Sequence, residues 1–262
     1  MTERLFLVTP EAWGDAEEGD VVRVTGSEAR HAVQVVRLGV GERVLVSDGA
    51  GRRSLGEIVS AQPTELVVRL GTLEHVPEPS PRFVLVQALA KADRDEQAIE
   101  AATELGVDAV VPWQAYRSIV KWRGQRPDQG ARFDKGARAD KADKGRQRWV
   151  SVVSAAAKQA RRPRVPMVAG LAGLAGVREL VAAAELALVL HEDASEPLAG
   201  VELPASGDVV VVVGPEGGIS PEELETLAAA GARLVRLGPE VLRSGSAGPA
   251  ALAVLNAASR WR

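Results

Sequence analysis

The sequence predicts an α/β protein in which a small β-rich domain precedes a larger domain built on a parallel sheet. Short β-branched runs separated by turn residues fill the first seventy or so positions. Strands alternate with helices after residue 82. Between these patterns, prolines at alternate positions favour extended backbone and break regular structure. We therefore expect domains at 1–74 and 82–262, joined by a linker at 75–81.

The N-terminal domain is expected to be a small barrel or sandwich with one helix. Its strands are predicted at 5–8, 21–24, 43–46, 57–59 and 66–68, with a hairpin connection at 48–51. Ser27 is predicted to cap the helix, which ends near Gly39. Ala32, Val35 and Val36 would share its apolar face.

The C-terminal domain is expected to hold a parallel sheet covered by helices on both faces. Asp93 is predicted to cap a helix that Gly106 ends, and Ser220 a helix that starts at Pro221. Residues 124–145 are rich in Gly, Asp, Lys and Arg, and we interpret them as an exposed insertion. Strands are predicted at 83–86, 107–111, 186–190, 209–213 and 234–237, and the other helices at 149–160, 177–184 and 246–259.

Composition narrows the class of protein. With 46% apolar residues the chain can build a sizeable core, and the absence of cysteine excludes disulfides and thiolate metal sites. The three histidines are scattered, so we expect no metal. Apolar runs are strand-length rather than membrane-length, and the first residues do not resemble a secretory signal. We expect a cytoplasmic protein without a membrane span.

Charge is unevenly distributed. The formal net charge is −3, but residues 117–164 carry fifteen Lys or Arg and four Asp, a net of +11. Such a segment is able to neutralise phosphates of a nucleic acid. The alternative, a solvated charged loop and helix face, stays open on this observation alone.

A glycine-rich loop follows the predicted strand 209–213. Its sequence is Gly214-Pro-Glu-Gly-Gly218, after which Ser220 and Pro221 open a helix. Ligands of open parallel sheets bind beyond the carboxyl ends of strands, so we favour a ligand loop over a tight turn. The loop is not a phosphate-binding P-loop, because no Gly-Lys-Ser/Thr follows and Glu216 would repel a phosphate.

A second loop, 237–248, also lies between a strand and a helix. Two such loops are able to form opposite walls of one cleft. Arg243 is its cation and could hold an anionic group, although a surface arginine is equally consistent with this motif. His191 ends a third strand, where we favour a strand-end role over that of a general base.

Together these loops resemble the RsmE family of small-subunit ribosomal RNA methyltransferases, in the SPOUT superfamily. The resemblance rests on Gly214–Ser220, on Leu237-Gly238, and on Leu242-Arg243-Ser244 before an Ala-rich helix. It extends over most of the chain, through Arg30-His31 with Val36-Arg37, Lys91-Ala92-Asp93 with Thr103–Val107, and Lys158–Arg162 with Pro166. Lys158 stands where the family often has Glu, and Ser244-Gly245-Ser246 where it often has Thr-Glu-Thr.

The resemblance implies a PUA-like β-barrel followed by a SPOUT-type α/β domain with a C-terminal trefoil knot. It also implies a homodimer, S-adenosylmethionine as cofactor, and 16S ribosomal RNA in the small subunit as partner. Arg243 is the catalytic candidate. RNA-binding candidates are His31, Arg37, Arg117, Lys121, Arg161 and Arg162. Cofactor-binding candidates are Leu190, His191, Gly214, Glu216, Gly217, Gly218, Leu237, Gly238, Leu242, Arg243, Ser244, Ser246 and Ala247.

The implied reaction is methyl transfer to N3 of a specific uridine in 16S ribosomal RNA. One alternative is a SPOUT methyltransferase acting on another RNA position, and a second is a non-catalytic RNA-binding factor of ribosome assembly. A dehydrogenase is disfavoured, because no G-x-G-x-x-G opens a helix after the first strand.

Overall fold

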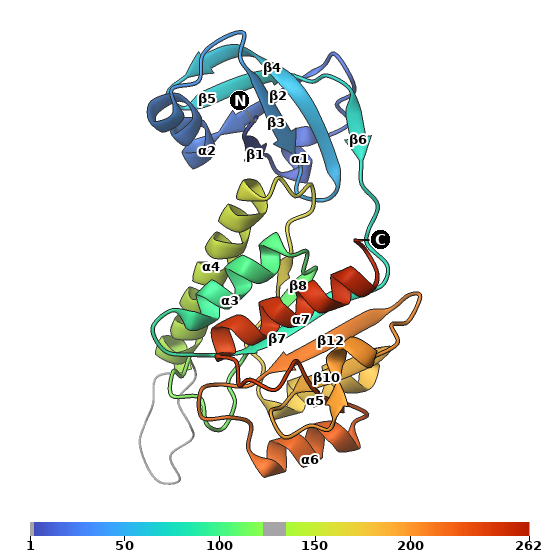
Figure 1. Cartoon of the computed structure of the whole chain (residues 1–262). Coiled ribbons are helices and arrows are strands. Elements are labelled where there is room, and N and C mark those ends of the chain that lie inside the picture. Colours follow the sequence, from blue (N-terminus) through green and yellow to red (C-terminus); the bar gives the residue numbers. More distant parts are fainter. Residues whose placement is uncertain (1–2, 123–134, 262) are drawn as a thin grey trace. The chain divides into compact units, whose positions relative to one another are not determined.

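The computed structural model describes residues 3–122 and 135–261, with the backbone alone for 135–140. Two compact units divide the chain (Figure 1). The first comprises Met1–Glu78 and Ser154–Val165, and the second Pro79–Val153 and Pro166–Arg262. Within the described ranges, no helix combines the length and apolar character needed to cross a membrane.

The first unit is built on a six-stranded sheet in the order β1-β3-β4-β5-β2, with β6 paired to β4. Alternate valines of β2 and β3 are buried, because successive side chains of a strand point to opposite faces. The predicted strands are confirmed, whereas β6 and the short helix α1 (Pro10–Trp13) were not predicted. The strands are β1 (Leu5–Leu7), β2 (Val21–Thr25), β3 (Arg43–Ser47), β4 (Arg52–Gln62), β5 (Glu65–Arg69) and β6 (Leu73–His75).

The helical segment of this unit differs from its prediction. An α-helical stretch, α2 (Gly26–Arg30), continues as a π-helix, η1 (His31–Val36), and Arg37 ends it in the left-handed region at φ 65°. The prediction that Ser27 is the cap was wrong, because Thr25 is the extended residue before the helix. Val35 is 67% exposed, since the wider π-turn changes which residues share a face.

The second unit contains a seven-stranded sheet in the order β11-β13-β10-β12-β7-β8-β9, and every pairing is parallel. This confirms the predicted parallel sheet. Val209–Val213 is uniformly apolar because both faces of its strand are covered. The strands are β7 (Arg82–Ala88), β8 (Ala109–Trp113), β9 (Met167–Val168), β10 (Leu186–Leu190), β11 (Glu196–Pro197), β12 (Asp208–Val213) and β13 (Arg233–Arg236).

Helices cover both faces of this sheet. On one face α3 (Arg94–Glu104) and α7 (Ser244–Ala258) pack together over β7 and β12 (Figure 1). A Cβ at Gly248 of α7 would lie 3.0 Å from Leu85, so glycine permits this close approach. On the other face α5 (Leu174–Ala183) and α6 (Pro221–Ala229) enclose a core with alternate residues of β7, β10 and β12. A 3₁₀ turn, η2 (Leu198–Gly200), follows β11.

Helix α4 (Lys135–Gln159) is much longer than the predicted helix at 149–160. The predicted insertion at 124–145 is therefore wrong for 135–145, while 123–134 lie outside the described residues. Ala142, Gly145 and Trp149 form a buried helical face. A Cβ on Gly145 would fall 2.4 Å from the Trp122 ring, which meets Trp149 edge-on at 5.6 Å. The packing of Trp122 against Gly145 therefore stabilises α4 in a region where composition predicted a loop.

Two helix starts also differ from expectation. Asp93 precedes α3 but lies in the left-handed region at φ 56° and makes no side-chain cap. Its carboxylate instead faces Arg148, 3.4 Å away. Helix α7 begins at Ser244 rather than Ser246, with Arg243 as its N-cap. The predicted cap at Ser220 and the start of α6 at Pro221 are confirmed, and Glu223 completes a capping box that was not predicted.

Candidate functional site

A cavity of about 340 Å³ opens at the carboxyl edge of the parallel sheet. The ends of β10 and β12 and the segment 241–247 provide most of its lining. A neighbouring hollow of about 80 Å³ shares Leu190–Glu192, Val241, Leu242 and Ala247 and extends to residues 236–240. Loops that follow three parallel strands therefore converge, as expected for the ligand-binding edge of an α/β sheet.

The glycine-rich loop has the close packing that only glycine permits. A Cβ at Gly214 would lie 2.6 Å from Cγ1 of Ile219, and Gly218 has a positive φ of 72°. Gly214, Gly218 and Ile219 all line the cavity. The loop backbone is consequently exposed to a ligand from one side and fixed from the other.

A buried carboxylate fixes the far side of this loop. Oε2 of Glu223 accepts from the amide of Ser220 at 3.0 Å, and Oε1 accepts from the amide of Tyr116 at 2.8 Å. The adjacent Arg117 donates to the Gly217 carbonyl at 3.1 Å. The segment after β8 therefore supports the loop after β12.

Glu216 holds a neighbouring turn. Its Oε1 accepts from the amide of Lys91 at 3.0 Å and lies 3.5 Å from the Arg94 guanidinium. Ala92 and Asp93, between them, both have positive φ, which is uncommon for residues with a Cβ. This turn places Arg94 on the lining of the cavity.

The opposite wall is the start of α7. The carbonyl of Arg243 accepts from the amides of Ser246 and Ala247, while its exposed side chain lies on the cavity lining. Oγ of Ser244 is buried, lines the cavity and has no hydrogen-bond partner among the described residues. A buried hydroxyl without a partner indicates a place where a ligand supplies one.

His191 directly follows the last residue of β10, close to the strand end that the sequence predicted for it. Its amide donates to Val235, and its Nδ1 accepts from the amide of Asp193 at 3.2 Å. The ring thus participates in the local turn while lining the cavity.

The structure brings most of the predicted cofactor residues together. Gly217 and Ser246 are not on the lining of either cavity. The predicted residues on the linings are Leu190, His191, Gly214, Glu216, Gly218, Leu237, Gly238, Leu242, Arg243, Ser244 and Ala247. Residues that sequence reasoning missed are Arg94, Glu192, Val213, Pro215, Ile219, Arg236, Glu240 and Val241. Most adjoin predicted positions, but nothing local in the sequence linked Arg94 to these loops.

The predicted RNA contacts occupy several places. Arg117 lies against Gly217 in the second unit, and Lys121 is half-buried. Arg37 is exposed at the end of η1, and Arg162 is half-buried. His31 and Arg161 line a separate cavity in the first unit.

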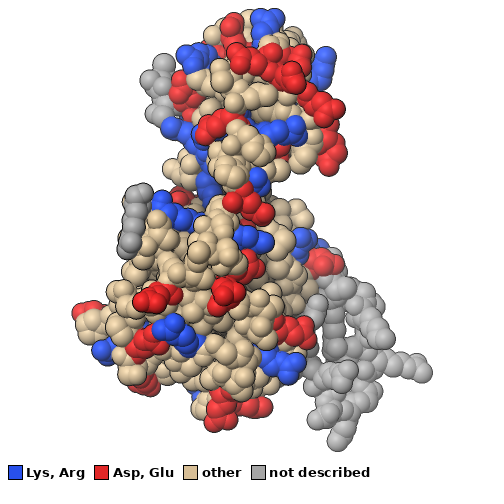
Figure 2. All heavy atoms as spheres, turned by 90° about the vertical axis from the view of Figure 1, so that its right-hand side faces the viewer, with Lys and Arg blue, Asp and Glu red and all other residues tan. Residues whose placement is uncertain are grey.

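Part of the basic segment is used within the fold. Arg148 pairs with Glu96 at 2.7 Å, and Arg146 donates to the Val168 carbonyl at 3.1 Å. On the face of the second unit drawn in Figure 2, basic and acidic side chains are interspersed. Arg146 and Arg148 of the segment are therefore engaged by partners within the fold.

The donor set of the cavity fits an amino-acid-bearing nucleoside such as S-adenosylmethionine. Leu190, Val213, Ile219 and Leu242 provide apolar surface for a purine. Glu192 and Glu216 are acceptors for ammonium and hydroxyl groups, whereas Arg94 and Arg243 suit a carboxylate. Among the described residues no three His, Asp or Glu side chains cluster as metal ligands would.

Next to Arg94, Asp95 is buried at the start of α3. Burial raises the pKa of Asp95 to about 6, although backbone hydrogen bonds from Glu96 and Ala90 oppose the shift. The carboxyl group therefore titrates near neutral pH beside the candidate site.

Comparison with known families defines the class of protein that carries this fold and site. A model described as an RNA methyltransferase domain matches residues 77–256, and one described as an RNA methyltransferase PUA domain matches residues 24–71. The predicted α/β methyltransferase domain with a PUA-like domain before it is confirmed. The trefoil knot stays a prediction.

Within this class, the chain belongs to the ribosomal RNA small subunit methyltransferase E family. It is 42% identical to the protein of that name from Mycobacterium bovis, over 94% of this chain and 90% of the relative. The Bacillus subtilis protein of that name is 29% identical, over 92% of this chain and 91% of the relative.

Solved structures have the same architecture. A Legionella pneumophila methyltransferase in complex with the bound cofactor SAM matches with a TM-score of 0.81 and 27% identity, covering 98% of each chain. A ribosomal RNA small subunit methyltransferase E from Neisseria gonorrhoeae also has a TM-score of 0.81, at 24% identity and 98% coverage of each chain, which shows the shared fold.

Proposed function

We propose that this protein is an S-adenosylmethionine-dependent methyltransferase that methylates N3 of a specific uridine in small-subunit 16S ribosomal RNA. The observation that carries the proposal is the cavity at the carboxyl edge of the sheet, where the glycine-rich loop faces the start of α7. Membership of the methyltransferase E family selects this reaction over other uses of such a cavity.

Different lining residues bind the nucleoside and the amino-acid end of the cofactor. S-adenosylmethionine, when bound, supplies an electrophilic methyl group. The backbone of Gly214 and Gly218 and the side chains of Leu190 and Leu242 hold and enclose the nucleoside. Arg94 and the Ser244 hydroxyl are the donors for its carboxylate end.

Arg243 is the catalytic candidate. Arg243 lines the cavity as the N-cap residue of α7, where the helix end carries a partial positive charge. N3 of uracil must lose its proton before it attacks a methyl group, and the resulting charge spreads over the ring and its oxygens. A cation held at this position lowers the energy of that anion and orients the base.

The remaining parts of the proposal concern partners and location. The PUA-like unit binds RNA, and a homodimer with knotted C-terminal domains presents contacts from both subunits to one substrate. The protein works in the cytoplasm on the small ribosomal subunit. Membership of the methyltransferase E family is the observation that supports these parts of the proposal.

The proposal is tested by incubating the protein with isotope-labelled S-adenosylmethionine and small ribosomal subunits that lack their native methyl groups. The RNA is digested and the labelled nucleoside identified. Label in N3-methyluridine is expected. Label in another nucleoside or on a ribose would replace the proposed position, and cofactor binding without transfer to subunits or naked RNA would refute the substrate. No cofactor uptake in calorimetry would favour a non-catalytic assembly factor.

A further inference from the structure

The first unit contains a cavity of about 700 Å³ that the methyl-transfer site does not use. Its lining comes from β1, from the α2 and η1 segment, and from the end of α4 with the residues that follow. All of these residues belong to the first compact unit. The lining residues are Glu3, Arg4, Leu5, Phe6, Ser27, Glu28, His31, Ala155, Lys158, Gln159 and Arg161.

The cavity carries nitrogen donors that the fold does not use. No side-chain hydrogen bond or ion pair engages Arg4, His31 or Arg161 within the described residues. The backbone of Arg161, by contrast, is fixed, because its carbonyl accepts from Arg53 at 3.0 Å. Arg161 thus has a fixed backbone and a guanidinium group with no hydrogen-bond partner among the described residues, which suits it to bind an anion.

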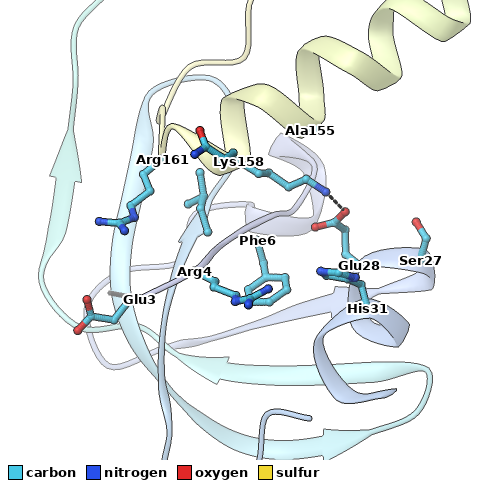
Figure 3. Close-up of a pocket in the computed structure, with 11 residues that line it drawn as sticks. Glu3, Arg4, Phe6, Ser27, Glu28, His31, Ala155, Lys158 and Arg161 are labelled. Carbon is cyan, nitrogen blue, oxygen red and sulfur yellow. Dashed lines mark hydrogen bonds and ion pairs between the residues drawn. The ribbon is translucent and has the colours of Figure 1, made fainter. Parts of the chain in front are cut away.

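One cation is already neutralised. Lys158 reaches from α4 to Glu28 of α2 at 2.5 Å, as Figure 3 shows. This ion pair joins two walls of the cavity. Among the described residues it leaves Arg4 and Arg161 as lining cations without an ion pair, and Glu3 as a lining carboxylate without one. Leu5, Phe6 and Ala155 add apolar lining between the polar groups. Apolar side chains next to guanidinium groups are the combination that binds a base together with its phosphate.

We propose that this cavity receives one unpaired nucleotide of the substrate RNA. Arg4 and Arg161 contact its phosphates, and the base enters beside Ala155 and His31. The cavity volume falls in the range of roughly 300–1,000 Å³ typical of small-ligand sites, which accommodates a single nucleotide but not a base-paired helix. The proposal rests on the proposed function only in taking RNA as the ligand.

Two variants of the full chain separate the two parts of the proposal. Ala155 is exposed on α4, so Ala155→Trp fills the cavity without disturbing the core. Arg161→Gln removes one available charge and keeps a polar side chain. The matched controls are Ser151→Trp, at an exposed position on the same helix, and Arg178→Gln, at an exposed arginine of α5.

The probe is a fluorescein-labelled single strand of ten RNA nucleotides. The comparison is the same strand paired in a duplex. Binding affinity for each is measured by fluorescence anisotropy at several salt concentrations. Ala155→Trp is expected to weaken single-strand binding on the order of tenfold, the contribution of one stacked base, with duplex binding unchanged. Arg161→Gln is expected to reduce the slope of log K against log salt by about 0.7, the value for one phosphate of a single strand. Both controls should match the wild type.

Single-strand affinity and salt slope unchanged in both cavity variants would overturn the proposal. Equal losses for single strand and duplex would also overturn it, since they indicate a general electrostatic effect. The subunit methylation assay is run in parallel. If the wild type transfers methyl groups and both cavity variants keep wild-type affinity for the single strand, the proposed role of the cavity is refuted but the proposed function is not. If the wild type transfers no methyl groups and the variants lose affinity for the single strand only, the proposed function is refuted and the cavity remains an RNA-binding site.

Discussion

Glu223 accepts a hydrogen bond from the amide of Tyr116 at 2.8 Å, although Glu223 lies in the first turn of α6 and Tyr116 in the segment that follows β8. The same buried carboxylate caps α6 through the Ser220 amide. One side chain therefore couples the start of a helix to the support of the glycine-rich loop. Its contribution to folding and to the site can be measured separately.

Replacing Glu223 by Ala is expected to destabilise the protein by about 3 kcal/mol, since a buried carboxylate with two amide donors is lost and the cap is removed. Denaturant unfolding measures the change. The control is Glu222→Ala, an exposed residue in the same helical turn, which should remain within about 0.5 kcal/mol of wild type. Equal effects of the two substitutions would contradict a special role for Glu223.

Gly214→Ala is expected to weaken S-adenosylmethionine binding by about tenfold or more, because a Cβ there would lie 2.6 Å from Ile219 and displace the loop. Calorimetry with the cofactor measures this. Gly170→Ala serves as control, since a Cβ at that position meets nothing within 4 Å. Retained affinity in Gly214→Ala would show that the loop backbone does not position the cofactor.

Arg243→Ala is expected to lower kcat on the order of a hundredfold or more, as loss of a group that stabilises a developing anion does. The defect should shrink at alkaline pH, where more uracil is deprotonated in solution, and Arg243→Lys should recover part of the rate. Steady-state kinetics across pH, with cofactor affinity from calorimetry, provide the test. A pH-independent defect matched by an equal loss of cofactor affinity would assign Arg243 to cofactor binding instead.

Asp95→Asn is expected to change how stability depends on pH. Because burial raises the pKa of Asp95 from 3.8 to about 6, the folded protein binds this proton more tightly than the unfolded chain does. The associated stability is complete below pH 3.8 and is lost as pH rises through about 6. The variant lacks this loss, so relative to wild type it should gain about 2 kcal/mol as the pH rises from 4.5 to 8.

Unfolding at fixed pH values measures the difference for Asp95→Asn, with Glu100→Gln, at an exposed position of the same helix, as control. A constant difference between wild type and Asp95→Asn across this range would show that Asp95 does not titrate there.

The sequence determined the elements whose signals are local. The run Val209–Val213 predicted a buried parallel strand because only a strand covered on both faces is uniformly apolar. Ser220 and Pro221 predicted the start of α6, because a serine cap followed by proline at the first helical position is a signal carried by adjacent residues. The two loops of the candidate site were likewise recognisable, since each follows a strand and opens a helix.

Only the tertiary structure decided what depends on residues far apart in the chain. Trp122 packs against Gly145 and contacts Trp149, which joins α4 to a residue outside that helix, although the composition of 135–145 predicted a loop. Glu216 brings Arg94 into the cavity from a turn more than a hundred residues earlier, through contacts that no local pattern encodes. Local periodicity reports which face of an element is apolar, but packing decides which distant element meets it and therefore which side chains share a site.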